Sequence, residues 1–274
     1  MTPTTPTTPM TPMTSNRIAR MRNVVALIFG AALVASAPLS ARTLAEIQSR
    51  GVISMCANPD ALPHSSNKPE TPGFQIEIGR ALAAALGVQL QVDWIIPRAR
   101  ANLVDCDMLL DTIVDPVTQR GPVKLSQPYQ KSGVALALIA GNDQVQRFQD
   151  LAPGKRIGVM INSLASKLLN QRDMRTVPYS FESDMLADLA KGDIDACAIS
   201  PAPIAHYIRT HPGSGLRFVH AYDTEPELKW DLAVGLRRSD EALVAAVNDG
   251  LARIAREGKL ASIYSTYNVD YRQP

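Results

Sequence analysis

Residues 52–87 decide the fold, and their sequence is VISMCANPDALPHSSNKPETPGFQIEIGRALAAALG. The first five residues form a short apolar run bounded by turn residues, which indicates a strand buried on both faces. The four prolines that follow keep the next segment out of regular structure. Apolar residues then recur at helical spacing over residues 74–85, and Gly87 ends the predicted helix. Because open α/β sheets bind ligands at the carboxyl ends of their strands, we expect the loop to form one wall of a cleft.

The composition is that of a globular chain without a strongly charged partner. Its 274 residues are 46% hydrophobic and 20% charged, and the net charge is +2. This length accommodates one large domain or two smaller ones. A nucleic-acid-binding protein usually carries a strongly basic surface, so we expect no nucleic-acid partner.

The N-terminal segment predicts export. Basic residues at positions 17–22 precede an uncharged apolar run over residues 24–37 and then the residues PLSA, which end at Ala41. This layout is typical of a secretory signal peptide. The apolar run is shorter than the roughly 20 residues of a membrane-spanning helix. We therefore expect cleavage after Ala41 and a periplasmic product that is not an integral membrane protein. The Thr/Pro-rich start at positions 1–14 is low in complexity and cannot form a core.

The strand–helix pattern of the first unit occurs a second time, which predicts two α/β lobes. The first lobe comprises residues 42–132 and 237–274, and the second comprises residues 133–236. Two crossover strands would form a hinge, so that the cleft between the lobes could open and close. We expect Ser239 to cap the long helix that follows it. Further strands are predicted at 88–94, 106–114, 133–140, 156–161, 176–181, 194–200 and 228–236, and further helices start near 163, 184, 240 and 260.

The three cysteines, Cys56, Cys106 and Cys197, permit one disulfide in an oxidising compartment. The predicted strands place Cys56 at a strand end and Cys106 at the start of the parallel neighbour. That offset of about four residues, at about 3.3 Å each, amounts to roughly 13 Å. A disulfide joins Cα atoms that are at most about 7 Å apart. We therefore expect no Cys56–Cys106 bond, and small buried apolar side chains instead.

Four segments, in a shared order and spacing, carry a resemblance to a known family. They are Gly73-Phe74 with the helix that ends at Leu86-Gly87, Thr118-Gln119-Arg120 followed by Ser126-Gln127-Pro128-Tyr129, Leu189 to Ala196, and Leu251 with Gly258 to Tyr264. Over residues 43–267 the chain resembles the bacterial periplasmic solute-binding proteins of family 3, the polar amino-acid type. The resemblance implies a two-lobed type II periplasmic-binding-protein fold in which each lobe is a mostly parallel sheet flanked by helices. It also implies a small-molecule solute and an ABC importer as partner.

A more local resemblance concerns the first strand and its loop. Cys56-Ala57-Asn58-Pro59, Leu62-Pro63, Ser65 and Cys106-Asp107 are similar to the branch of family 3 linked to quinoprotein alcohol dehydrogenases, the J-type accessory proteins of methanol oxidation. This similarity implies an alternative function, in which the two-lobed fold serves a periplasmic quinoprotein dehydrogenase as its partner.

The family resemblance assigns Arg120 to the ligand carboxylate, since a guanidinium presents a planar fork that matches this group. The alternative is a surface arginine that pairs with Asp115. The family holds the ligand ammonium with an acid after a second-lobe strand, and Ser200 stands there in this chain. A neutral hydroxyl does not replace a charge-assisted contact to a buried ammonium. We therefore expect a small polar or anionic solute rather than an ordinary α-amino acid.

Other candidate ligand contacts lie at strand ends and at helix starts. They are Asp60, His64, Trp94, Asp111, Thr112, Asn162 and Ser163, in addition to Ser200. Solvation of an exposed loop is the alternative for the first two, and core packing is the alternative for the tryptophan. For the asparagine and the serines the alternative is helix capping.

Neither a metal site nor catalysis is predicted. The acidic residues Asp107, Asp111 and Asp115 could supply the oxygen ligands that hard cations prefer, but a strand does not bring them around one ion. The four histidines lack metal-ligand spacing. No nucleophile elbow, paired-cysteine motif or glycine-rich phosphate loop stands at a strand–helix junction. We expect a binding protein that is not an enzyme and has no cofactor.

Overall fold

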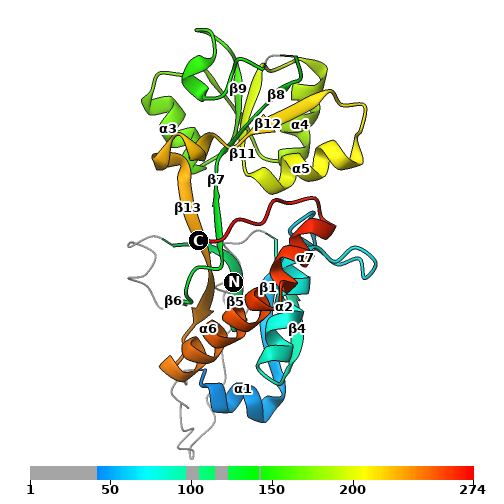
Figure 1. The fold of residues 1–274 in the computed structure, drawn as a ribbon, viewed down its shortest axis with the longest axis vertical. Helices are drawn as coiled ribbons and strands as arrows, with labels where there is room; N and C mark the ends of the chain where they lie inside the picture. The colour runs from blue at the N-terminus through cyan, green and yellow to red at the C-terminus, as the bar shows by residue number, and fades with distance from the viewer. Residues whose placement is uncertain (1–41, 97–104, 115–122, 142) are drawn as a thin grey trace, which may run out of the picture. The chain divides into compact units, whose positions relative to one another are not determined.

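The computed structural model describes residues 42–96, 105–114, 123–141 and 143–274, and they contain two mixed β-sheets with helices packed against them (Figure 1). The predicted signal peptide, Arg120 and Asp115 lie outside these residues. No helix among the described residues has the length and apolar character needed to cross a membrane.

The six-stranded sheet has the order β4-β1-β5-β13-β6, with β7 also paired to β13. Its strands are β1 (Val52–Ala57), β4 (Gln89–Trp94), β5 (Met108–Ile113), β6 (Val123–Leu125), β7 (Gln130–Gly133) and β13 (Lys229–Arg237). Strand β1 is parallel to β4 and β5, whereas β13 is antiparallel to β5, β6 and β7. The predicted burial of β1 is confirmed, since five of its six residues are buried.

Four helices share a core with this sheet, and together we call them lobe 1 (Figure 1). They are α1 (Leu44–Arg50), α2 (Phe74–Ala85), α6 (Glu241–Arg256) and α7 (Lys259–Thr266). Helix α2 starts after Gly73, which has φ +89°. A Cβ at this position would lie 2.5 Å from the carbonyl oxygen of His64, so only glycine fits. This packing holds the loop before α2 against the helix start. The loop contains a small hairpin of β2 (Asp60–Ala61) and β3 (Ser65–Ser66).

The five-stranded sheet has the order β10-β9-β11-β8-β12 and belongs to what we call lobe 2. Its strands are β8 (Ala135–Ile139), β9 (Ile157–Met160), β10 (Thr176–Tyr179), β11 (Ala196–Ile199) and β12 (Leu216–Val219). Side chains of β8 and β11 alternate between two separate cores, one on each face. Helix α3 (Leu164–Gln171) contributes to one core, and α4 (Glu182–Lys191) and α5 (Pro201–Thr210) contribute to the other. Three short 3₁₀ helices complete the described chain: η3 (Phe148–Asp150), η4 (Ala221–Asp223) and η5 (Pro226–Leu228).

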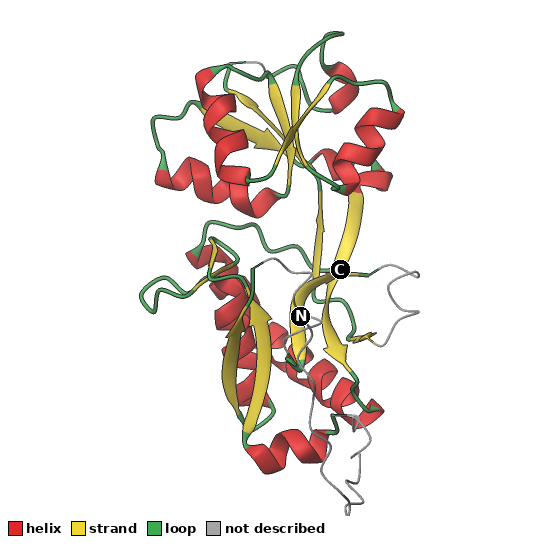
Figure 2. Cartoon of the chain, turned by 180° about the vertical axis from the view of Figure 1, so that it is seen from behind, coloured by secondary structure: helices red, strands yellow, loops and turns green. Residues whose placement is uncertain are grey.

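The chain passes twice between the sheets (Figure 2). It leaves the six-stranded sheet through β7, enters the five-stranded sheet as β8, and returns through β13. Strands β7 and β13 pair with each other, with Gly133 opposite Lys229. The predicted two-lobed α/β fold is confirmed, with one reversed strand in each otherwise parallel sheet: β13 in the first and β8 in the second.

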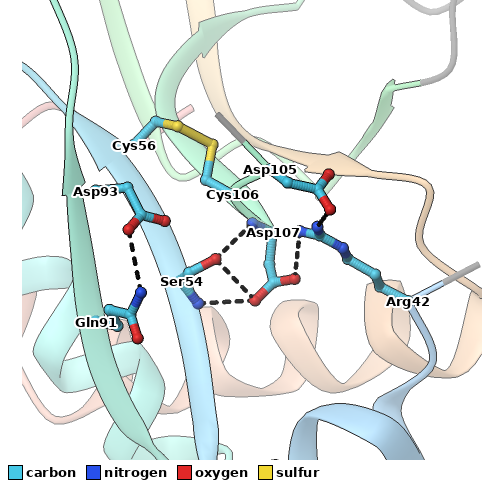
Figure 3. The surroundings of a disulfide bond; sticks show 8 residues. All are labelled: Arg42, Ser54, Cys56, Gln91, Asp93, Asp105, Cys106 and Asp107. Atoms are coloured by element: carbon cyan, nitrogen blue, oxygen red, sulfur yellow. Dashed lines mark hydrogen bonds and ion pairs between the residues drawn. A yellow bond between two sulfur atoms is a disulfide. The ribbon is translucent and has the colours of Figure 1, made fainter. Parts of the chain in front are cut away.

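The expectation about the disulfide was wrong, because Cys56 and Cys106 form one, with their Cα atoms 5.6 Å apart (Figure 3). The chain bends at Asp107 instead of continuing the line of β5. The Asp107 backbone N–H donates to the Ser54 carbonyl oxygen at 3.0 Å. This contact brings Cys106 beside the end of β1, whereas the prediction assumed a straight strand from Cys106 onward. Cys197 is a free, buried thiol.

Two helix starts also differ from expectation. Asp240, not Ser239, caps α6, and its carboxylate accepts from the Leu243 backbone N–H at 2.8 Å. Helix α5 was not predicted, although Pro201 occupies its first position. Proline is well suited to the first helical position, where its missing N–H leaves no bond unmade.

Candidate functional site

A cavity of about 200 Å³ is lined by residues of both lobes and of the C-terminal segment. Loop and helix residues of lobe 1 supply His64, Phe74 and Gln75, and strands β5, β7 and β13 supply Asp111, Gln130, Lys131, Trp230 and Leu232. The start of α5 supplies Ser200 and Ala202 on the side of lobe 2. Loop ends and strand ends thus meet at one site, as in ligand clefts of open α/β sheets.

A β-bulge places Asp111 on the wall of this cavity. Along β13, Ala233 pairs with Thr112 and Gly235 pairs with Leu109, so β5 has one extra residue in this interval. Asp111 has φ +53°, the left-handed conformation that residues other than glycine seldom adopt. A bulge of this kind redirects a side chain from its place in the pleat. Backbone outliers that the surroundings hold in place occur preferentially at functional sites.

Two neutral donors hold the Asp111 carboxylate. The Gln75 side-chain amide donates to Oδ2, and the Tyr129 hydroxyl donates to Oδ1. The same hydroxyl accepts from the Asp111 backbone N–H at 3.0 Å, so it fixes both the side chain and the bulged backbone. The carboxylate is therefore fixed in position at the cavity before any ligand arrives.

Aromatic side chains of α2 and α7 support the floor of the cavity. The ring centroid of Phe74 lies 4.9 Å from that of Tyr264 and 5.0 Å from that of His64. The Tyr264 hydroxyl donates to the Gln130 side chain, and burial raises the pKa of this tyrosine well above its usual value. These contacts connect the C-terminal helix α7 to strand β7, so residues from distant parts of the sequence hold the site together.

A second cavity, of about 150 Å³, adjoins the first on the side of lobe 2. Its lining includes Ser163, Glu182, Ser200 and Trp230, of which the last two also line the first cavity. Burial raises the pKa of the Glu182 carboxyl. Ser163 caps α3, and its hydroxyl oxygen accepts from the Ser166 backbone N–H at 3.0 Å.

The predicted site residues divide into two groups. Three of them, His64, Asp111 and Ser200, meet at the first cavity, and Ser163 reaches the second. The others that the structure describes do not line either cavity: Asp60 and Asn162 are exposed, Trp94 is 40% exposed at the end of β4, and Thr112 is buried beside Gly235.

Most of the other residues of the site were missed, among them Gln75, Tyr129, Trp230 and Glu182. Gln75 was predicted to be an ordinary position of the helix after Phe74. Its place near the helix start, at the end of the loop chosen as the cleft wall, is the signal that could have identified it.

Of the acidic residues considered for a metal, Asp107 and Asp111 lie in the described part of the chain, and protein groups hold both carboxylates. Asp107 is fully buried and forms an ion pair with Arg42 at 2.6 Å (Figure 3). It forms a second ion pair with Arg50 at 3.0 Å. Its carboxylate also accepts from the Ser54 backbone N–H at 2.8 Å. Among the described residues, no group of three or more His, Cys, Asp or Glu side chains is placed to hold a metal ion.

Comparison with known proteins shows a family to which the chain is similar. The family model for bacterial extracellular solute-binding proteins, family 3, matches residues 53–270. The chain is 23% identical over 225 residues to a probable histidine-binding protein of Neisseria gonorrhoeae, covering 79% of this chain and 82% of the relative. It is 25% identical over 198 residues to the L-cystine-binding protein TcyJ of Escherichia coli (strain K12), covering 70% and 72%.

Solved structures share the fold. An ancestral cationic amino acid solute-binding protein superposes with a TM-score of 0.71 at 20% sequence identity, covering 82% of this chain and 99% of the other. An ancestral arginine-binding protein bound to arginine gives a TM-score of 0.64 at 20% identity, covering 80% and 98%.

Proposed function

The chain belongs to the bacterial extracellular solute-binding proteins of family 3, and we propose that it is a periplasmic receptor that closes over a small polar solute and delivers it to an ABC importer. The observation that carries the proposal is the cavity whose wall is shared by Asp111 of β5 and Ser200 before α5. A site with one wall on each lobe is completed only when the two lobes hold the same ligand.

The connection between the lobes supports this mechanism. Only two segments, β7–β8 and β13, pass between the two sheets of the described chain, and β7 pairs with β13. Paired crossover strands allow the lobes to rotate about a narrow hinge while each sheet keeps most of its own core. Ala202 of α5, which packs into the core of lobe 1, and Trp230, which packs against the cores of both lobes, are the contacts shared between them. Ligand binding would then stabilise the closed form in proportion to its contacts with both walls.

The sequence resemblance adds one further element to the proposed site. Arg120 matches the position at which the family binds a ligand carboxylate, and it lies outside the described residues. If it serves this role, Arg120→Ala weakens binding of a carboxylate ligand and leaves the affinity for ligands without this group unchanged.

A thermal-shift screen of amino acids, amines and carboxylates tests the proposal. A ligand at 100 times its Kd stabilises the folded state by about 2.7 kcal/mol, which corresponds to roughly 5–10 °C for a chain of this size. Ser200→Phe places a bulky ring in the cavity and should abolish the shift. Ser262→Phe is the matched control, since Ser262 is exposed on α7 away from the cavity. A shift that survives Ser200→Phe would contradict the assignment of the site.

A second function, as an accessory protein of a periplasmic quinoprotein dehydrogenase, is favoured by the rim of lobe 2. Three large apolar side chains are exposed there, Phe181 at 67%, Ile161 at 51% and Leu164 at 41%. Ile161 follows β9, Leu164 is the first residue of α3, and Phe181 is the N-cap residue of α4. All three positions lie beyond the carboxyl ends of the parallel strands β9 and β10. Exposed apolar patches often mark protein–protein contacts.

Co-purification with the dehydrogenase distinguishes the two functions. Capture of the dehydrogenase that is lost in Phe181→Ser, combined with no hit in the solute screen, would support the accessory function. A saturable solute with wild-type affinity in Phe181→Ser and no captured dehydrogenase would support the receptor.

A further inference from the structure

We propose that the cleft binds an organic cation and that the Asp111 carboxylate of lobe 1 holds its charged nitrogen. This inference rests on the solute-binding function proposed above and names the chemical class of the solute.

The first argument is the position of the carboxylate. The bulge in β5 and the left-handed backbone of Asp111 bring the side chain to the cavity wall, where Gln75 also lies. An uncharged residue such as glycine or asparagine adopts this conformation at least as readily. The backbone conformation therefore does not explain why residue 111 is an acid. We infer that the negative charge is there to bind a positively charged group of the ligand.

The second argument is the remaining hydrogen-bonding capacity of Asp111. An ionised carboxylate offers about four lone-pair positions. The described donors, the Gln75 amide and the Tyr129 hydroxyl, use one position on each oxygen. Each oxygen can accept one more bond from the side of the cavity, and a primary ammonium or a guanidinium supplies such donors.

The third argument is charge balance within the described residues. The carboxylates of Asp111 and Glu182 line the adjoining cavities, and neither forms an ion pair with a described residue. A third acid, Asp270, is paired with Arg272 at 2.8 Å. Lys131 also lines the first cavity and offsets only part of this negative charge. A desolvated carboxylate gains most from a ligand of opposite charge.

The opposite wall offers little to an anion. A helix N-terminus binds anions through its free backbone N–H groups. In α5 the first and third positions are Pro201 and Pro203, which have no N–H. Trp230 lies between the two cavities, and an indole face attracts cations. Both walls therefore favour a cationic group on the ligand.

A set of short linear probes tests the proposal by calorimetry on the full mature chain. Three are five-carbon chains that differ in their end groups: cadaverine carries two ammonium groups, glutarate carries two carboxylates, and 1,5-pentanediol is neutral. The fourth, L-lysine, carries a side-chain ammonium on an amino acid. We expect binding of cadaverine or lysine and none of glutarate or pentanediol.

Asp111→Asn provides the decisive variant, because asparagine tolerates a left-handed backbone and keeps an acceptor for Tyr129 or Gln75. Losing one charge-assisted contact should weaken binding of the cationic probe about 10- to 100-fold. Asp173→Asn is the matched control, since Asp173 also has a left-handed backbone, with φ +56°, but is exposed and lines neither cavity. Its affinity for the cationic probe should stay within about threefold of the wild-type value.

The outcomes separate the two proposals. Binding of glutarate or pentanediol in preference to the amines would overturn the cation assignment while leaving the receptor function in place. Unchanged affinity of a cationic probe in Asp111→Asn would also overturn it. If no compound of the wider screen binds, the receptor function fails and the cation assignment fails with it. Equal losses in Asp111→Asn and Asp173→Asn would show a general effect of charge and would count against a specific contact.

Discussion

The disulfide between Cys56 and Cys106 should contribute a large share of the stability of this chain. It closes a loop with a sequence separation of 50 residues and joins the end of β1 to the segment before β5. In the chain-entropy model, cross-linking a loop of this length destabilises the unfolded state by about 4 kcal/mol at 25 °C. Removing the bond by the double substitution Cys56→Ala/Cys106→Ala should therefore lower the free energy of unfolding by roughly 2–4 kcal/mol.

Two measurements check this prediction. Thiol titration of the denatured, unreduced protein should give one thiol per chain, from Cys197, and three after reduction. Urea unfolding of the wild type and of the double variant should then show the loss of free energy as a lower midpoint concentration. Thermal unfolding should show the same loss as a fall in Tm of roughly 5–15 °C. Cys197→Ala is the control, because it removes a buried thiol and leaves the cross-link intact. Its small side chain limits the cavity cost.

The reasoning would be refuted by three free thiols in the unreduced secreted protein, because the bond would then be absent. It would also be refuted if the double variant and the wild type unfolded at the same urea concentration. The double variant could also lose less free energy of unfolding than predicted, by the same amount as the wild type loses when its disulfide is reduced. That result would show that the unfolded state retains structure near the two cysteines.

Three further predictions concern the scaffold. Asp107→Ala should destabilise the fold by about 1–3 kcal/mol, since it leaves the buried Ser54 backbone N–H without its carboxylate acceptor and removes one ion-pair partner of Arg42 and of Arg50. Asp105→Ala, at an exposed carboxylate, should cost less than about 1 kcal/mol in the same urea titration. Gly133→Ala should cost about 1–3 kcal/mol, because the added Cβ would lie 2.5 Å from the Leu228 carbonyl oxygen and from the Tyr222 ring. Unchanged stability would contradict the packing of β7 against η4 and η5. Burial raises the pKa of Tyr179 and Tyr222 to about 12, so the stability that they contribute is present below pH 10 and lost as the pH rises from 10 to 12, which a Tm series with the double Phe variant can measure.

Local patterns were sufficient to predict most of the elements. The apolar run that became β1 and the helical spacing of α2 depend on neighbours in sequence, and both were predicted close to their observed bounds. Helix α5 was missed although a local signal for it was present. Pro201 stands at its first position, and proline favours the first turn of a helix.

Non-local contacts explain what could not be predicted. The Cys56–Cys106 bond depends on the bend at Asp107, which the buried contact to Ser54 imposes from 53 residues away. In the site, Asp111 was a candidate on its residue type alone. The direction of the Asp111 side chain depends on the bond to Tyr129 and on the extra residue of β5 opposite β13. Such a register shift cannot be obtained from the sequence of one strand.

The left-handed backbone of Asp111 predicts which of two variants, Asp111→Gly or Asp111→Ala, has the larger free energy of unfolding. At an ordinary strand position, glycine is less stable than alanine by roughly 0.5–1 kcal/mol, because it loses more conformational freedom on folding. At φ +53° the order should invert, since a Cβ in the left-handed region costs about 1–2 kcal/mol. Both Asp111→Ala and Asp111→Gly remove the carboxylate, so the lost bonds to Gln75 and Tyr129 cancel in the comparison. The glycine variant should therefore unfold at the higher urea concentration, whereas at the exposed strand residue Gln91 the alanine variant should do so. The same order at both positions would mean that β5 does not hold Asp111 in a bulge, and the carboxylate would then have no structural reason to face the cavity.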